Sequence, residues 1–355
     1  MSASRRPGAA SGSGGPRRGP GRGIGRGTGG GPRRGLVLGG GGVLGAAWMV
    51  GALKSLEDQL GMDVREFDEY VGTSAGAVLA ALLGAGVPVT DLLAHQLEGV
   101  IDTGPLADHA WDYEKDTGGD RPGLPRLGMG SRELLRRNAL HLRQLPPTAI
   151  LSAVLPEGRG SLEAVGALVG HVVPTGWVDR GGLCVVALGY DNGERVAFGR
   201  EGAPAADLHD AVMASCAIPG WYQPVQIGGH RYIDGGAWSS TNLDLMVGRG
   251  LDEVFVLAPQ VSFVRDAPRH WRTRVERQWR NRVTLRALRE LHKVHKDGAE
   301  VTMLGPGEED LEAFGANLMD VRRRPQVIET SLRTSAVALR EPAPLPSRSE
   351  FEDVG

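Results

Sequence analysis

The chain has 355 residues, of which 41% are hydrophobic and 54 are glycine, with 40 Lys and Arg against 42 Asp and Glu. This length allows one large domain or two small ones. Two cysteines are too few for a disulfide framework, and no run of 18 apolar residues predicts a membrane-spanning helix, so we expect a cytoplasmic globular protein.

The first 34 residues differ sharply in composition from the rest. They contain eight arginines, no acidic residue and almost no apolar side chains, so they are predicted to be disordered. They also lack the apolar stretch of a signal peptide. A basic arm for nucleic acid or anionic lipid is one interpretation. We favour a solvated extension and expect no specific nucleic-acid partner, because Arg-Gly spacing without aromatic residues carries no specific readout.

Two strand–turn–helix units follow the tail. The stretch "GLVLGG" (35–40) predicts a short buried strand, and apolar residues at helical spacing predict a helix over 43–60. The stretch "EYVGTSAGAVLAALLGAG" (69–86) repeats the pattern, with a helix that is apolar on all sides and therefore buried. Two such units in succession predict an α/β fold, with a mostly parallel central sheet and helices on both faces.

The remainder of the chain divides into a helical insertion and further strands. Residues 87–172 contain helical patches and Gly- and Pro-rich loops, with no clear strand. Strands are predicted at 182–190, 195–199 and 252–259, and a hairpin with a Gly-Gly turn at 225–236. We therefore expect a disordered tail over 1–34, a catalytic domain over 35–335 with an insertion at 87–172, and a flexible tail over 336–355.

The stretch "GTSAG" (72–76) carries the clearest chemical motif. It is a G-x-S-x-G sequence between a strand and an apolar helix, which is the arrangement of a nucleophile elbow. Gly72 and Gly76 allow a sharp turn that exposes the Ser74 hydroxyl at the end of the sheet. The dipole of the following helix favours a developing negative charge there. The competing interpretation is a serine that only caps the helix.

A serine nucleophile needs a base, and the nine histidines offer none in an obvious catalytic context. Asp234 in "YIDGG" ends a predicted strand and precedes Gly235 and Gly236, so its carboxylate can accept a proton from a serine directly. An ordinary Asp-Gly turn is the alternative. A second Asp-Gly pair, in "KDGA", places Asp297 after a basic helical stretch, and we interpret it as a helix end.

Four consecutive glycines, Gly39 to Gly42, immediately precede the first predicted helix. Backbone N–H groups at such a position can stabilise an oxyanion, with no side chain in the way. The alternative is a dinucleotide site, since Gly40, Gly42 and Gly45 satisfy G-x-G-x-x-G. The second strand ends in G-x-S-x-G rather than in the required acid, and no Walker lysine follows. We therefore expect no nucleotide, and no cofactor or metal, because no cluster of ligand spacing is visible.

Taken together, "GGGGVLG", "GTSAG" and "DGG", in this order, resemble the motifs of the patatin-like phospholipase family. The stretch "MASCAIPGWYQPVQIGGHRYIDGG" (213–236) adds to the resemblance, which covers about residues 35–335. It implies a lipid acyl hydrolase with a three-layer fold and a Ser–Asp dyad, in which Ser74 is the nucleophile and Asp234 the general base. The implied oxyanion-hole residues are Gly40, Gly41 and Gly42, and the glycines that support the motifs are Gly45, Gly72, Gly76, Gly235 and Gly236.

One position departs from the family pattern. Many members carry an arginine or lysine just before the last glycine of the first motif, and this chain has Leu44. The apolar residue removes a cation near the expected site, which puts binding of an anionic headgroup in doubt.

The expected reaction is hydrolysis of a phospholipid, lysophospholipid or acylglycerol through an acyl-enzyme. The alternatives are a soluble carboxylesterase or thioesterase, and a catalytically silent lipid-binding protein. The acyl chain requires an apolar slot, for which the helix after Ser74 and the 87–172 insertion are the candidate walls. These apolar patches can equally be part of the core, which is the interpretation we favour for any single side chain.

The basic stretch 269–296 has apolar residues every four positions and carries Trp271 and Trp279. It predicts an amphipathic helix that rests on anionic lipid as a peripheral membrane contact. The alternative, which we favour, is a solvated helix packed by its apolar stripe. The sequence leaves the oligomeric state open.

Overall fold

The computed structural model describes residues 31–117, 128–139, 145–179, 181–263 and 271–341, without the side chains of 271–277. Most of the predicted N-terminal tail and of the predicted C-terminal tail lies outside these residues. Arg33 and Arg34, at the end of the predicted tail, form ion pairs with Asp68 and Glu253, and Arg34 begins the first strand.

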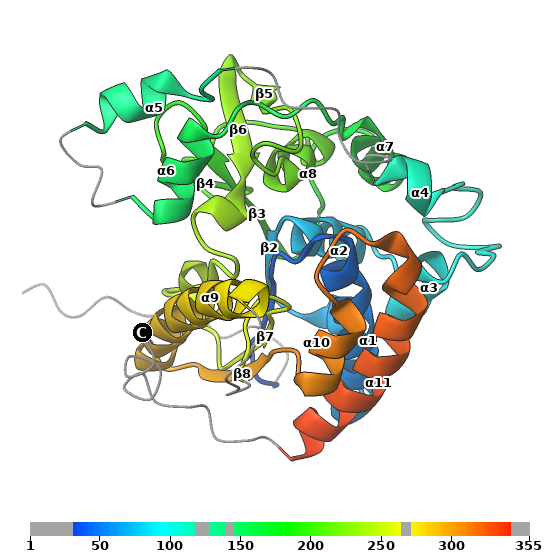
Figure 1. Ribbon diagram of the computed structural model, residues 1–355. Helices are drawn as coiled ribbons and strands as arrows, with labels where there is room; N and C mark the ends of the chain where they lie inside the picture. The colour runs from blue at the N-terminus through cyan, green and yellow to red at the C-terminus, as the bar shows by residue number, and fades with distance from the viewer. Residues whose placement is uncertain (1–30, 118–127, 140–144, 180, 264–270, 342–355) are drawn as a thin grey trace, which may run out of the picture. The chain divides into compact units, whose positions relative to one another are not determined.

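Eight strands form one mixed sheet in the order β5-β6-β3-β2-β1-β7-β8, with β4 also paired to β3 (Figure 1). Strands β3, β2, β1, β7 and β8 are mutually parallel, whereas β4, β5 and β6 pair antiparallel. The strands are β1 (Arg34–Leu38), β2 (Glu69–Thr73), β3 (Gly182–Gly189), β4 (Arg195–Phe198), β5 (Val225–Ile227), β6 (His230–Asp234), β7 (Glu253–Leu257) and β8 (Glu300–Leu304).

Helices cover both faces of the sheet, which confirms the predicted α/β fold. Alternate residues of a strand point to opposite faces, so Leu36 and Leu38 join the larger core cluster while Val37 joins the smaller one. The larger cluster is covered by α1 (Gly42–Leu60), α2 (Ala75–Gly84), α8 (Leu208–Cys216), α10 (Glu308–Phe314) and α11 (Arg324–Arg340). On the other face lie α9 (Trp271–Lys296) and the 3-10 helix η4 (Leu243–Met246) (Figure 1).

The described part of 87–172 contains five short helices and no strand, apart from one isolated bridge between Gly160 and Tyr222. These helices are α3 (Val89–Gln96), α4 (Tyr113–Asp116), α5 (Arg132–Arg137), α6 (Pro147–Val154) and α7 (Glu163–Val172). Helix α7 packs against α8, and α3 packs against α1. Helices α3 and α7 thus join the helical layer that also carries α2, whereas Ala149 of α6 packs in a small separate cluster with Leu188 of β3 and Ile233 of β6.

The sequence patterns do not predict β8, α8, α10 or α11. Strand β8 (EVTML) lies at the sheet edge, and three of its five residues are exposed or half-buried, so it lacks a continuous apolar run. Helix α11 continues to Arg340, beyond the predicted domain end at residue 335. Within the described ranges, no helix combines the length and the apolarity needed to cross a membrane.

The parallel register brings two predicted motifs to one edge of the sheet. Leu38 of β1 pairs with Gly72 of β2, so the glycine run after β1 and the turn after β2 leave the sheet side by side. In parallel sheets, ligands bind outside the carboxyl ends of the strands.

Candidate active site

Ser74 occupies a strained turn between β2 and α2. Its φ of 54° and ψ of −124° lie in a region that residues with a side chain rarely adopt. Although Ser74 is the N-cap residue of α2, its side chain makes no capping hydrogen bond. The geometry is therefore that of an elbow that presents the hydroxyl, rather than that of a capping serine.

The two glycines of the elbow permit close contacts of the backbone. A Cβ atom on Gly76 would lie 2.0 Å from the carbonyl oxygen of Leu38, and one on Gly72 would lie 2.6 Å from the Cα of Ala77. No side chain fits at either position without a shift of backbone. The glycines thus allow β1, β2 and the first turn of α2 to pack against one another.

Ser215 of α8 holds the elbow in place through two hydrogen bonds, a role that no sequence motif indicates. The backbone N–H of Ser74 donates to Ser215 Oγ (2.9 Å), and this hydroxyl donates to the carbonyl oxygen of Val186 in β3 (2.6 Å). Ser215 has no exposed surface. The only signal in the sequence is its place in the small-residue run of "MASCAIPG".

Asp234 ends β6 and lies beside Ser74, so the structure brings together the two residues of the predicted dyad. The side chain is buried, and Oδ1 accepts a hydrogen bond from the N–H of Gly236 (2.7 Å). Burial raises the pKa of Asp234 to about 6, while the Ser74 hydroxyl and the Gly236 N–H, both of which donate to the carboxylate, oppose the rise. The adjacent Gly235 is required for packing, because a Cβ there would lie 2.2 Å from the carbonyl oxygen of Val186.

The predicted oxyanion-hole glycines differ in their hydrogen bonding. Gly40 lies against the nucleophile, since a Cβ on it would be 3.4 Å from the Cβ of Ser74, but its N–H already donates to the carbonyl oxygen of Ser240 (2.8 Å). Within the described residues, the N–H groups of Gly41 and Gly42 have no acceptor. Gly42 also has a φ of 62°, which favours glycine.

The side chains of Pro259 and Met319 lie close to Gly41, Gly42 and Gly45 and leave no space for a Cβ atom there. Cβ atoms on Gly41 and Gly45 would lie 2.6 and 3.1 Å from the Cγ of Pro259. A Cβ on Gly42 would lie 2.9 Å from the Sδ of Met319. The run is therefore enclosed by side chains from the C-terminal half of the chain, and each of the three glycines avoids a close contact.

Leu44, the position that departs from the family pattern, is fully buried in the larger core cluster. Its N–H donates to the carbonyl oxygen of Leu318 (2.9 Å). Its side chain is not part of the cavity lining described below.

None of the described histidines hydrogen-bonds to Ser74 or Asp234. His95 Nδ1 bonds to the hydroxyl of Tyr113, His171 Nε2 to the carbonyl oxygen of Ala107, and His209 lies near Asp210. In the described structure, Asp234 is thus the titratable group that interacts with the Ser74 hydroxyl.

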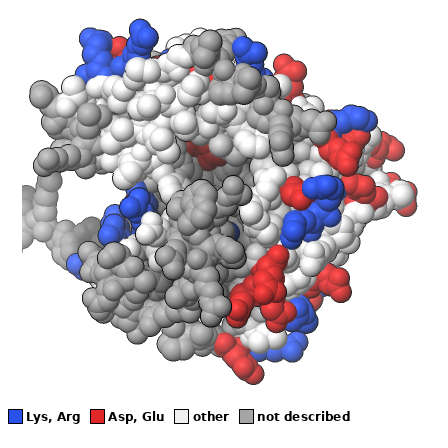
Figure 2. Space-filling model, viewed as in Figure 1, with Lys and Arg blue, Asp and Glu red and all other residues white. Residues whose placement is uncertain are grey.

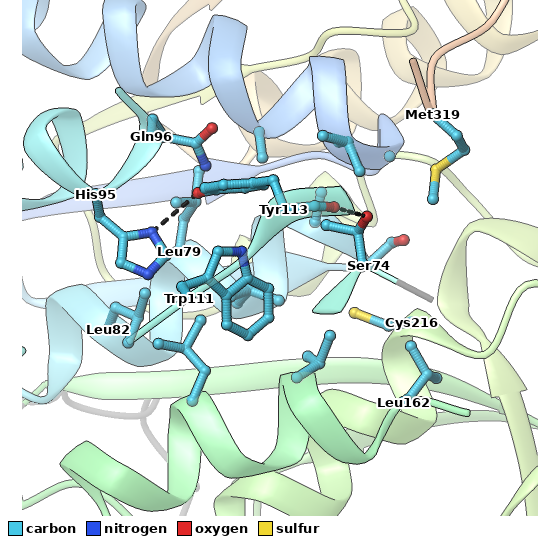
Figure 3. A pocket seen from close by; sticks show the side chains of 18 of the residues that line it. Ser74, Leu79, Leu82, His95, Gln96, Trp111, Tyr113, Leu162, Cys216 and Met319 are labelled. Atoms are coloured by element: carbon cyan, nitrogen blue, oxygen red, sulfur yellow. Dashed lines mark hydrogen bonds between the residues drawn. The ribbon is translucent and has the colours of Figure 1, made fainter. Parts of the chain in front are cut away.

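An apolar cavity of about 110 Å³ extends from Ser74 along α2 (Figure 3). The wall of α2 consists of Ala75, Val78, Leu79 and Leu82. Residues of the 87–172 segment form much of the remaining lining, including Leu92, His95, Gln96, Trp111, Tyr113, Leu162, Val165 and Leu168. Cys216 and Met319 lie at the end that holds Ser74 (Figure 3). The site therefore joins a serine and a carboxylate to a slot suited to an apolar chain.

The structure also brings together a group of potential metal ligands that no ligand spacing in the sequence predicted. Ligand atoms of Asp207, His209 and Asp210 lie within 4.8 Å of one another at the start of α8. Asp207 Oδ1 already accepts a hydrogen bond from the N–H of Gly176 (2.7 Å). None of the three residues lines the cavity.

Comparison with known proteins gives one family match. A family model described as patatin-like phospholipase matches residues 36–247. No curated protein matches the sequence.

Similar solved structures include VipD and the type III effector ExoU. VipD from Legionella pneumophila is 15% identical, with a TM-score of 0.39 over 87% of this chain and 67% of its own. The type III effector ExoU is 17% identical, with a TM-score of 0.32 over 87% of this chain and 53% of its own. A chain of the ExoU–SpcU complex from Pseudomonas aeruginosa is 19% identical, with a TM-score of 0.29 over 85% of this chain and 59% of its own. The chain thus spans little more than half the length of the ExoU chains.

Proposed function

Because the chain belongs to the patatin-like phospholipase family, we propose that its catalytic domain, residues 35–335, hydrolyses lipid acyl esters with a Ser74–Asp234 dyad. The proposed substrates are phospholipids, lysophospholipids or acylglycerols. The observation that carries the proposal is the contact between the Ser74 hydroxyl and the buried Asp234 carboxylate at one end of an apolar cavity.

In the first half of the reaction, Ser74 Oγ attacks the ester carbonyl carbon while Asp234 accepts the hydroxyl proton. The carbonyl oxygen becomes an oxyanion, to which the N–H groups of Gly41 and Gly42 donate. We assign the oxyanion hole to these two residues, because the Gly40 N–H is already bonded to Ser240. Asp234 then gives the proton to the leaving alcohol, and the acyl group stays on Ser74.

In the second half, water attacks the acyl-enzyme. Asp234 accepts a proton from this water and returns it to Ser74 Oγ as the ester bond breaks, which releases the carboxylic acid. A raised pKa suits this exchange, because a carboxylate with a higher pKa is a stronger base. The N-terminus of α2 faces the reacting centre and favours the negative charge.

The test compares acyl release by the wild type with that by Ser74→Ala and Asp234→Asn. Each substitution should lower kcat by about a thousandfold or more, since removal of a nucleophile or its base has such an effect in other serine hydrolases. Asp297→Asn is the matched control, because Asp297 also precedes a glycine but is exposed near the end of α9. Full activity of Asp234→Asn would place the general base elsewhere.

The cavity volume gives specific support to a second candidate, a soluble carboxylesterase or thioesterase. At about 110 Å³ it is smaller than the engineered cavity of roughly 150 Å³ that binds benzene. A long chain must therefore displace part of the lining or extend into solvent. Higher kcat/KM for short soluble esters than for long-chain lipids would favour this candidate, and binding of lipid without hydrolysis would favour a silent lipid-binding protein.

We further propose that α9 makes a peripheral contact with anionic membranes. Its apolar stripe, with Ala287 and Val294, packs in the smaller core cluster, which leaves a basic face exposed. On that face Trp279 is 43% exposed, and the exposed basic residues are Arg282, Arg289, Lys293 and Lys296. Acidic side chains instead gather over α10 in Figure 2, where they would repel anionic lipid.

Sedimentation with phosphatidylcholine vesicles, with and without phosphatidylserine, tests this contact. Binding should require phosphatidylserine, weaken with salt and decrease in the Arg282→Gln, Arg289→Gln double variant. Arg136→Gln, Arg137→Gln on α5 is the matched control. Equal binding to both kinds of vesicle would contradict an electrostatic contact.

A further inference from the structure

Residues 239–243, which follow the turn at Asp234, form a buried loop against the glycine run. The carbonyl oxygen of Ser240 accepts the hydrogen bond from the Gly40 N–H (2.8 Å). A Cβ atom on Gly39 would lie 3.1 Å from the same oxygen. The two proposed oxyanion donors follow Gly40 directly, so the position of the 239–243 loop affects where they lie.

Asn242 ties the same loop to the end of β2. Its φ of 50° lies in the left-handed region, which asparagine tolerates better than most residues. The side-chain Nδ2 donates to Thr73 Oγ1 (3.0 Å) and to the carbonyl oxygen of Ser239 (2.7 Å). Thr73 is fully buried and immediately precedes Ser74. The 239–243 loop is therefore bonded both to the glycine run and to the strand that presents the nucleophile.

A buried carboxylate on α9 accepts several hydrogen bonds from this loop. Oε2 of Glu290 accepts from the hydroxyl of Thr241 (2.7 Å) and from the N–H of Leu243 (3.0 Å). The hydroxyl of Ser239 also donates to this carboxylate, and Arg286 Nε donates to Oε1 (3.3 Å). The η4 helix that begins at Leu243 packs against both α9 and β2. One side chain of a distant helix thus holds three residues of the loop.

Glu290 is 4% exposed and does not line the cavity. Within the described residues, its hydrogen bonds reach neither Ser74 nor Asp234, so it can affect the reaction only through the loop. Burial and the nearby Asp244 raise the pKa of its carboxyl, while the hydroxyl groups that donate to it favour the charged form. A carboxylate oxygen can accept two hydrogen bonds at once, which lets one side chain fix two points of a loop.

We propose that Glu290 is a positioning residue, which through the 239–243 loop keeps the nucleophile and the two oxyanion donors at the separation that the reaction requires. The inference rests on the proposed function, from which it takes these groups. Without Glu290, Thr241 and Leu243 would lose their acceptor, and the loop could shift away from Gly40. A displacement of about 1 Å caused by a change far from the chemistry can lower a rate by about a hundredfold.

The test is Glu290→Leu, which removes the acceptor. We expect kcat for a 4-nitrophenyl ester to fall about ten- to a hundredfold, while KM changes by less than about twofold, because the cavity walls are unaltered. The Ki of a trifluoromethyl ketone, which forms a tetrahedral adduct on the serine, should rise by about the same factor as kcat/KM falls. Glu290→Gln keeps an oxygen that can accept from Thr241 and Leu243, so it should retain most of the activity.

Asp310→Leu on α10 is the matched control. Asp310 is 2% exposed and also accepts from a hydroxyl and a backbone N–H, those of Thr334 (2.9 Å) and Gly307 (2.9 Å). It does not line the cavity. Both leucine variants should unfold at a lower temperature than the wild type, whereas only Glu290→Leu should lower kcat. An equal effect of the two variants on kcat would show that Glu290 acts on stability alone and would overturn the inference.

Hydrogen–deuterium exchange requires no hydrolysis, so it separates this inference from the proposed function. The peptide that contains Gly40 should exchange about tenfold faster or more in Glu290→Leu, and at the wild-type rate in Asp310→Leu. Ser74-dependent hydrolysis with unchanged kcat and unchanged exchange in Glu290→Leu would overturn the inference and leave the proposed function intact.

Asn242→Gly tests the same loop without a change in α9, and it serves if Glu290→Leu does not fold. Glycine adopts the positive φ readily, so the variant chiefly removes the hydrogen bonds of the side-chain amide, including the one to Thr73. We expect a lower kcat at an unchanged KM. A wild-type kcat in Asn242→Gly would show that the loop does not position the site, which would overturn the inference.

Discussion

The backbone N–H of Ser74 donates to the hydroxyl of Ser215 at 2.9 Å, although 141 positions separate the two residues in the chain. The hydroxyl of Ser215 in turn donates to Val186 in β3. This pair of hydrogen bonds ties the strained turn to the sheet, and it keeps the N–H of Ser74 away from the substrate.

Ser215→Ala should therefore lower activity without removing a group that reacts. The N–H of Ser74 would lose its buried acceptor, at a cost of about 1–3 kcal/mol, and the elbow would be less well held. We expect kcat and the rate of Ser74 labelling by a fluorophosphonate to fall about tenfold or more, because each 1.4 kcal/mol is a factor of ten. Ser152→Ala, a buried serine of α6 outside the cavity, is the control. Unchanged labelling of Ser215→Ala would show that the hydrogen bond has no role in positioning.

The reaction should require deprotonated Asp234, and its pH dependence follows from that. Burial raises the pKa of this carboxyl to about 6, so the base is present above that pH and is lost as the pH falls through it. We expect kcat/KM for a neutral ester to be constant above pH 7 and to decrease about tenfold per pH unit well below 6. A profile that is flat down to pH 4 would contradict Asp234 as the base.

Gly76→Ala should destabilise the fold as well as the site. The new Cβ would lie 2.0 Å from the carbonyl oxygen of Leu38, so the backbone of β1 or α2 must shift. We expect a loss of about 3 kcal/mol in the free energy of unfolding, measured by urea denaturation. Gly170→Ala in α7 meets no atom within 4 Å and should instead stabilise by about 0.5–1 kcal/mol, from helix propensity. Equal effects of the two substitutions would show that the elbow is less tightly packed than described.

Trp111→Ala should extend the cavity. The Trp111 ring lies in the lining between Ser74 and His95, so its removal creates space for a longer chain (Figure 3). We expect the chain length with the highest kcat/KM, measured over a series of 4-nitrophenyl esters, to increase by several carbons. Leu151→Ala, an exposed residue of α6, should keep the optimum of the wild type. An unchanged optimum in Trp111→Ala would mean that the acyl chain does not pass this ring.

Local sequence patterns predicted those helices and strands that can be recognised from the pattern of neighbouring residues. The strand–turn–helix units around Gly40 and Ser74 are recognisable because apolar runs, helical spacing and glycine-rich turns are properties of neighbouring residues. The basic helix that ends at Lys296 is found for the same reason. By contrast, β8 was missed, because an edge strand with few buried residues carries little periodic signal.

The sequence alone predicts a serine on a glycine-bounded turn and an aspartate at the end of a strand, since each motif is local. The surroundings of these two residues depend on the packing of the whole fold. In the folded chain, the Gly40 N–H donates to Ser240 and the Ser74 N–H donates to the hydroxyl of Ser215. His95 and Gln96 form part of the cavity lining. The physical reason is that these contacts join segments far apart in the chain. The packing of strands and helices brings such segments together, and no spacing along the sequence records it.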